Sequence, residues 1–229
     1  MKMPSRALQN RAQMLFSLAL TQAPSAGLWM VLLMTGPAPV PAGQSAKRQA
    51  AHLANFQRLS NEGRLALVGP TMQPKSDLRG ILLVQAAGRQ QVIEEFRADP
   101  YVEHQNLALK VYEFFPMRGS FVTKRTDAKM TPVRLVWLEK NPLTPLPGTQ
   151  DWSRVLTNQI SFYNRAECPF RLAGSLGEDA EGGVIHILDT TDDAKAMAAS
   201  YRLPLVSSGM MKPRITPLFL AEGGMPKMP

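Results

Sequence analysis

The sequence predicts an α+β fold built from two copies of a β-α-β-β-α-β unit, the ferredoxin-like order. In the first copy, short apolar runs alternate with segments of helical periodicity between residues 28 and 116. The same order returns after about 104 residues, between 132 and 220. This period is too long for a solenoid repeat and suits a duplicated small domain.

Each element of the first copy has its own signal. The continuous apolar run 28–34 ends at Gly36-Pro37, as a buried strand would. Ser45 is placed to cap a helix that ends at Gly63, with Leu53, Phe56 and Leu59 at helical spacing. Further strands are expected over 65–68, 80–86 and 107–115, and a second helix over 90–98.

The second copy repeats these signals. The run ending in Gly174 parallels the one ending in Gly69, and the strand with Trp137 matches the run around Trp29. A sheet with helices on one face leaves its other face bare, so the copies should cover each other as a sandwich or barrel with a cleft between them. We expect strands over 132–138, 170–174, 183–188 and 211–220, and helices over 151–166 and 192–201.

Residues 1–27 have the layout of a signal peptide: a basic lead-in, a short apolar core and a small polar segment. The apolar core, 14–20, is too short to span a bilayer, and no other run reaches that length. A periplasmic or secreted protein is expected; a cytoplasmic protein, an organellar transit peptide or a start codon placed too early are the alternatives. Residues 117–131 would link domains 28–116 and 132–220, and 221–229 would form a tail.

Composition excludes several classes of site. The net charge is +8, but lysine and arginine do not cluster among aromatic residues, so we expect no nucleic-acid partner. The single Cys168 excludes an internal disulfide and a cysteine-based zinc cluster, and is interpreted as a partly buried residue. The three histidines lack metal-ligand spacing, so no metal is expected.

His52 and Asp99 are the candidate catalytic residues. His52 lies near the start of one predicted helix and Asp99 in a loop just past another, so they can meet in space. A neutral imidazole can accept a proton, and a carboxylate on its second nitrogen orients the ring and stabilises the imidazolium. Proton transfer at carbon suits this pair and needs no cofactor. Alternatively, the pair only ties a helix to a turn, which Asp before Pro often opens.

Other polar residues give weaker signals. His104 could line the same site, although a loop histidine is more often simply exposed. His186 falls mid-strand and is more typical of a core or surface position than of a ligand. Asp77 and Arg79 flank a loop and could contact an anionic substrate, although a solvated loop is the plainer interpretation; Arg64 is expected at the surface.

Several short motifs of the first copy occur in an order typical of a known family. They are Ala51-His52-Leu53-Ala54, Gly63-Arg64-Leu65, Gly69-Pro70, Gly80 and Asp99-Pro100-Tyr101-Val102. Over about residues 28–116 the chain thereby resembles the YCII-related domain. The resemblance implies the dimeric α+β barrel fold, related to muconolactone isomerase, and a catalytic dyad matched by His52 and Asp99. Most members have no established substrate, and one relative eliminates HCl from a chlorinated hydroxyquinol.

The second copy keeps the skeleton without the pair. Leu156-Thr157-Asn158 stands near the place of His52, and Tyr201-Arg202-Leu203-Pro204 near that of Asp99. We therefore predict an intramolecular dimeric α+β barrel with one site, facing the cleft between the repeats. The function predicted is a cofactor-free lyase or isomerase acting there on a small polar or aromatic compound. The alternative is a non-catalytic protein that binds a small ligand or partner, as a monomer or a homodimer.

Overall fold

The computed structural model describes residues 26–73, 76–120, 129–143, 149–177 and 183–221. The expected leader and tail therefore lie almost wholly outside the described residues. The expected linker, 117–131, lies largely outside them too, and its ends belong to strands. No helix among the described residues is long and apolar enough to cross a membrane.

The first half has the predicted order of elements with one helix more. Its strands are β1 (Gly27–Thr35), β2 (Leu65–Pro70), β3 (Leu78–Ala86) and β4 (Leu107–Arg118). Its helices are α2 (Ser45–Asn61), α3 (Arg89–Arg97) and α4 (Pro100–Glu103). The short α4 was not predicted, because a single turn is too brief to show helical periodicity.

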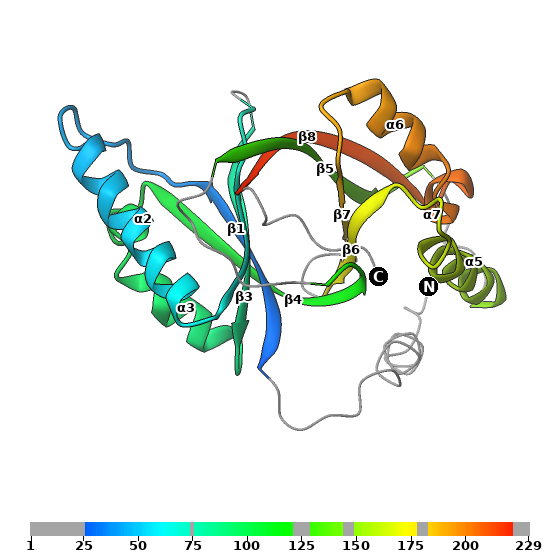
Figure 1. The fold of residues 1–229 in the computed structure, drawn as a ribbon, viewed down its shortest axis with the longest axis horizontal. Helices are drawn as coiled ribbons and strands as arrows, with labels where there is room; N and C mark the ends of the chain where they lie inside the picture. The colour runs from blue at the N-terminus through cyan, green and yellow to red at the C-terminus, as the bar shows by residue number, and fades with distance from the viewer. Residues whose placement is uncertain (1–25, 74–75, 121–128, 144–148, 178–182, 222–229) are drawn as a thin grey trace.

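The second half repeats this order, including a second short helix that begins at a proline. Its strands are β5 (Met130–Lys140), β6 (Phe170–Leu176), β7 (Val184–Leu188) and β8 (Met211–Ala221). Its helices are α5 (Thr149–Tyr163), α6 (Asp193–Tyr201) and α7 (Pro204–Ser207). Figure 1 shows α2 and α3 on the outer side of one half, and α5, α6 and α7 on the outer side of the other.

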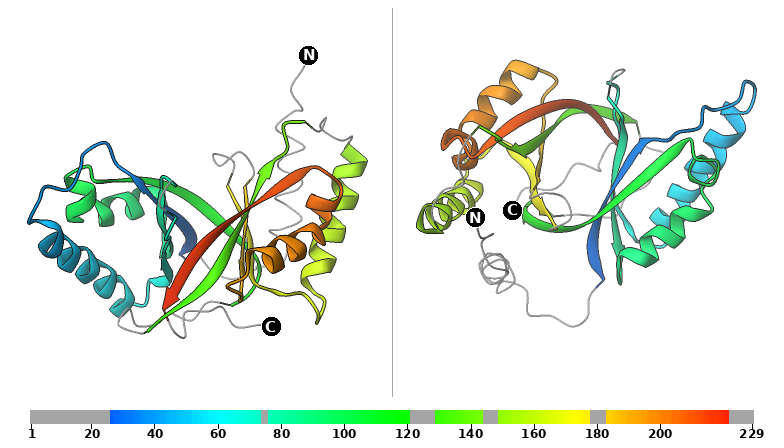
Figure 2. Two further views of the ribbon diagram at one scale, coloured as in Figure 1. Left: turned by 90° about the horizontal axis from the view of Figure 1, so that it is seen from above. Right: turned by 180° about the vertical axis from the view of Figure 1, so that it is seen from behind.

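The strands form one eight-stranded sheet in the order β2-β3-β1-β4-β6-β7-β5-β8, with antiparallel neighbours. The halves join where β4 pairs with β6, as in Phe114↔Leu176. At the other ends of the sheet, a single bridge between Thr71 and Leu218 brings β2 beside β8. The sheet thus curls into a nearly closed barrel, which the right view of Figure 2 shows.

Glycines allow the close approach at both seams of the barrel. A Cβ at Gly69 would lie 2.7 Å from the carbonyl oxygen of Phe219 on β8. A Cβ at Gly174 would overlap the ring of Phe114 on β4. The sequence predicted that the runs ending in Gly69 and Gly174 are equivalent. Their glycines lie at the two joins between the halves.

The barrel interior is a packed apolar core. On β1, Met30 and Leu32 face this interior, while Val31 and Leu33 face the helices. The predicted cleft between the halves is therefore wrong for the described residues, because alternate side chains from both halves fill the space. These are chiefly Met30, Leu32, Leu67, Ile81, Leu83, Phe114, Leu135, Leu172, Ile185, Ile187, Leu218 and Leu220, all buried.

The two tryptophans do not occupy matching places. Trp29 packs with the helix-facing side chains of the first half, whereas Trp137 packs against the barrel interior. Two apolar runs can be aligned in either register by eye, and only the pairing of strands distinguishes them. The predicted match between the strands holds, but that between the tryptophans is wrong.

Candidate functional site

His52 belongs to the buried face of α2. With Phe56 and Leu59 it forms the face of this helix that packs against the sheet, and only 7% of the residue is exposed. Leu53, which the periodicity placed on that face, is instead 48% exposed. The predicted cap is also shifted: Gln44 is the N-cap, and its side chain makes no capping bond. A polar histidine thus occupies a core-facing position.

Asp99 is the N-cap of α4. One carboxylate oxygen, Oδ1, accepts a hydrogen bond from the backbone N–H of Tyr101 at 3.1 Å, and Pro100 begins the helix. Proline is favoured there because it has no N–H to satisfy. The Asp99 side chain is fully buried. The sequence predicted Asp99 in a loop. The structure shows that this position is the N-cap of a turn of helix, which fixes the side chain.

The structure brings His52 and Asp99 into direct contact. His52 Nδ1 lies 2.6 Å from Asp99 Oδ2, so each carboxylate oxygen has a partner. An ionised carboxylate can only accept, so Nδ1 is the donor. In the neutral ring, Nε2 then carries the free lone pair. The predicted meeting of the two residues is confirmed, while their catalytic role remains a prediction.

The second ring nitrogen, Nε2, is available for chemistry. It makes no hydrogen bond with the residues that the structure describes, and it is not among the fully buried polar atoms that lack a partner. The rings of Phe56 and Tyr101 meet the imidazole edge-on, with centroids 4.2 and 5.1 Å away. The ring is therefore held on two sides, with Nε2 reaching the surface.

A buried asparagine anchors the segment that follows α4. Asn106 Nδ2 donates to the carbonyl oxygens of Ala38 and Pro39, each at 3.0 Å. Its Oδ1 accepts from Arg48 of α2 at 2.5 Å. Gly36 permits this docking, because a Cβ there would overlap the backbone of Gln105. The loop before α2 and the chain after α4 thus hold the two helices together.

The pair does not face the second half, contrary to the sequence-based expectation. His52 packs against Phe56, which belongs with Phe96 to the apolar layer between the helices and the outer face of the sheet. In Figure 1, α2 lies outside the barrel and the second half lies beyond the sheet. Both faces of this sheet are apolar, so the sequence did not show which one held the site.

In the second half, Leu203 takes the place of Asp99. It is the N-cap of α7, with φ −69° and ψ 128°, close to the −68° and 125° of Asp99. The side chain of a leucine cannot accept a hydrogen bond, and the N–H of Leu205 bonds instead to Gln159 Oε1 at 3.0 Å. Thr157, near the predicted counterpart of His52, is exposed. Gln159 of α5 is thus hydrogen-bonded to the first turn of α7.

Gln159 also begins a buried chain of hydrogen bonds. Its Nε2 donates to the hydroxyl of Tyr163 at 2.5 Å, and that hydroxyl lies 2.6 Å from His186 Nε2. Burial lowers the pKa of His186 to about 3 and raises the pKa of Tyr163, so both are neutral near pH 7. His186 is fully buried and so takes the core position, one of the two that the sequence left open for it.

The other candidate residues lie away from the pair or at its edge. His104 is exposed at the C-cap of α4. Arg79 donates to the hydroxyl of Thr35 at 2.8 Å. Arg64 forms ion pairs with Glu62 and Glu95. Among the described residues, no group of three or more histidine, cysteine or acidic side chains could hold a metal ion.

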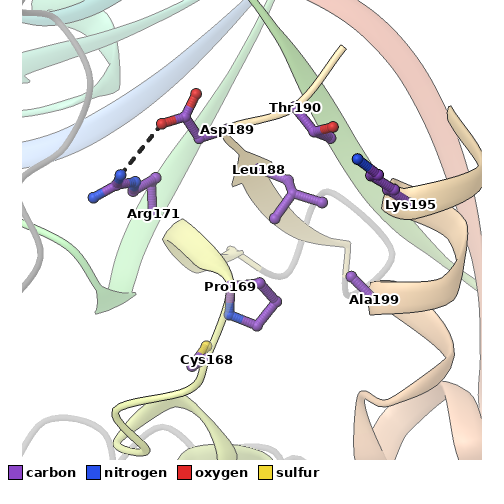
Figure 3. Close-up of a pocket in the computed structure, with 8 residues that line it drawn as sticks. All are labelled: Cys168, Pro169, Arg171, Leu188, Asp189, Thr190, Lys195 and Ala199. Carbon is purple, nitrogen blue, oxygen red and sulfur yellow. Dashed lines mark hydrogen bonds and ion pairs between the residues drawn. The ribbon is translucent and has the colours of Figure 1, made fainter. Parts of the chain in front are cut away.

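A shallow pocket of about 490 Å³ lies in the second half (Figure 3). Arg171 and Asp189 form an ion pair of 3.2 Å at its edge. Cys168 is buried in its wall, and burial raises the pKa of the thiol, which favours the protonated form. Neither His52 nor Asp99 borders this pocket. It is lined by Cys168, Pro169, Arg171, Leu188, Asp189, Thr190, Lys195 and Ala199.

The chain is similar in fold to several solved structures. A proposed monooxygenase from Fusobacterium nucleatum subsp. nucleatum shares 9% identity at a TM-score of 0.50, covering 90% of this chain and 99% of its own. A proposed monooxygenase from Lactobacillus acidophilus shares 14% at 0.46, covering 86% and 96%. A mutant chlorite dismutase from Candidatus Nitrospira defluvii shares 10% at 0.43, covering 87% and 96%. At 9% identity, the likeness to the Fusobacterium structure shows the fold alone and transfers no activity.

The family comparison concerns the half that contains the pair. No curated protein matches the sequence at a significant level. The model of the YCII-related domain matches residues 28–118, from the first strand to the end of β4. That range includes both His52 and Asp99 and ends before the second half begins. The half of the chain that contains the pair is therefore the part that is similar to the YCII-related domain.

Proposed function

We propose that the protein is a cofactor-free lyase or isomerase in which His52 is the general base and Asp99 orients it. One observation carries the proposal: Nδ1 is held by a buried carboxylate at 2.6 Å while Nε2 has no partner among the described residues. The substrate would be a small polar or aromatic compound bound over α2 and α4.

The proposed step is the transfer of a proton from carbon to Nε2. The electron pair left on the substrate forms a double bond and expels a leaving group in an elimination, or is reprotonated at another carbon in an isomerisation. Asp99 stabilises the positive charge that His52 gains, and the ring returns the proton to water or to product. Positioned acid–base catalysis of this kind contributes about 10²–10⁴-fold.

The experiment compares the wild-type protein with three variants on small hydroxy-aromatic compounds and lactones. We expect His52→Ala and Asp99→Asn to lose about 10²–10⁴-fold in turnover. His104→Ala, which removes an exposed histidine of the same region, should keep the wild-type rate. Equal turnover by all four proteins would reject the dyad.

A non-catalytic ligand-binding protein is the second candidate. It is supported by the pocket around Arg171 and Asp189, which lies in the other half and not at the pair. A ligand there would contact charged groups without reaching His52. Saturable binding at this pocket, unchanged in His52→Ala and with no turnover by any variant, would favour this alternative.

We infer further that the halves are a tandem duplication paired as an intramolecular dimeric α+β barrel. The supporting observations are the repeated order of elements, the seam glycines Gly69 and Gly174, and the matching N-cap dihedral angles of Asp99 and Leu203. The periplasmic or secreted location remains a prediction, and N-terminal sequencing of protein from its native host would test it.

A further inference from the structure

We propose that Arg48 binds the negatively charged group of the ligand beside His52, so that the site takes small organic carboxylates. This inference rests on the proposed function, because it assumes that ligands approach Nε2. It adds a residue outside the His-Asp pair and a chemical class for the ligand.

Arg48 is one helical turn from the candidate base. Residues four apart share a face of a helix, with Cβ atoms about 5–6 Å apart. Arg48 is half-buried, whereas its neighbours Lys47 and Gln49 are exposed. Its position therefore directs it toward the same side of α2 as His52, at the junction with the segment after α4.

The guanidinium group of Arg48 is held in place before any ligand arrives. Nη1 donates to Asn106 Oδ1 at 2.5 Å, and Nη2 donates to Gln44 Oε1 at 2.6 Å. Asn106 is itself buried and anchored to the carbonyl oxygens of Ala38 and Pro39. A donor fixed in this way loses little conformational freedom when it binds a ligand.

The positive charge of Arg48 is not balanced within the described part of the chain. Both of its partners are neutral amides, and it forms no ion pair there. The carboxylate of Asp99 is occupied by His52 and by the N–H of Tyr101. Arginine has five N–H donors, so two bonds leave others for a carboxylate. The same charge would stabilise the negative charge that develops as a proton leaves carbon.

The experiment follows the ring resonances of His52 by NMR while benzoate or the neutral benzamide is added. Wild-type protein should show a saturable shift with benzoate and bind benzamide about tenfold more weakly, a difference of about 1.4 kcal/mol. Arg48→Gln should weaken benzoate binding by about the same factor. Lys47→Gln, which removes the same charge one residue away, should bind benzoate as the wild type does.

Equal affinity for benzoate and benzamide in the wild-type protein would overturn the proposal, even if Arg48→Gln failed to fold. Unchanged benzoate binding by folded Arg48→Gln would also overturn it. Arg48-dependent benzoate binding without turnover of any hydroxy-aromatic compound or lactone would support the anion site and count against the proposed proton transfer. The two proposals therefore fail in different measurements.

Discussion

The two halves of the barrel use the same backbone turn for opposite purposes. In the first half, buried Asp99 caps α4 and also holds His52, whose other nitrogen reaches the surface. In the second half, Leu203 occupies the N-cap of α7, and Gln159 accepts the hydrogen bond from the N–H of Leu205. Gln159 also belongs to a chain of hydrogen bonds that ends at the buried His186. The comparison shows that a helix cap does not require an acid here, which favours a further role for Asp99.

The largest loss of stability is expected when the acid is placed in the half that lacks it. Leu203→Asp would bury a carboxylate at a fully buried position where Gln159 already satisfies the Leu205 N–H. An uncompensated buried charge costs about 3–5 kcal/mol. We expect urea unfolding to show a loss of this size, whereas Leu203→Ile should change stability far less. A Leu203→Asp variant as stable as wild type would mean that the second half can still accommodate an acid.

Acid pH should act on the second half through His186. Its pKa is about 3 in the folded protein and about 6.5 when exposed, so the unfolded state binds more protons between these values. Stability should therefore fall as pH drops from about 6.5 toward 3, by up to about 1.4 kcal/mol per unit. Unfolding free energies measured across this window should show a shallower slope for His186→Leu. An identical slope in that variant would assign the acid sensitivity elsewhere.

A comparable loss is expected when the first half is made to resemble the second. Asp99→Leu would leave His52 Nδ1 and the N–H of Tyr101 without their acceptor. Each buried group left unsatisfied costs about 1–3 kcal/mol. Denaturant unfolding would measure the loss, with Glu103→Gln, an exposed change in the same short helix, as control. No loss of stability in Asp99→Leu would mean that the first half, too, has another cap.

Much of the fold follows from the sequence because the long elements have clear periods. The strands and long helices lie close to their predicted positions, whereas α4 and α7 have only four residues each and show no period. The Asp-Pro pair marked a turn, and the structure shows that the turn is an N-cap. Helical spacing predicted that Leu53 would be buried, but Leu53 is exposed and the neighbouring His52 is buried. Such patterns therefore do not identify every buried position.

The position of the candidate site was harder to predict. The resemblance indicated which two residues meet, but β1 is apolar on both faces, so the pattern could not distinguish the helix side from the interior. Arg48 was missed because its role depends on Asn106, which is distant in sequence and is itself fixed by the loop before α2. Such contacts arise only when the segments are folded against each other.

The interior core joins side chains from both halves of a single chain. In an assembly of two chains, a core of this kind would form and separate with protein concentration. Here the intervening chain keeps one half permanently near the other, so dilution does not separate them. A substitution also falls on one half alone and is not imposed twice by symmetry. Each half can therefore change its polar residues independently while the shared core preserves the barrel.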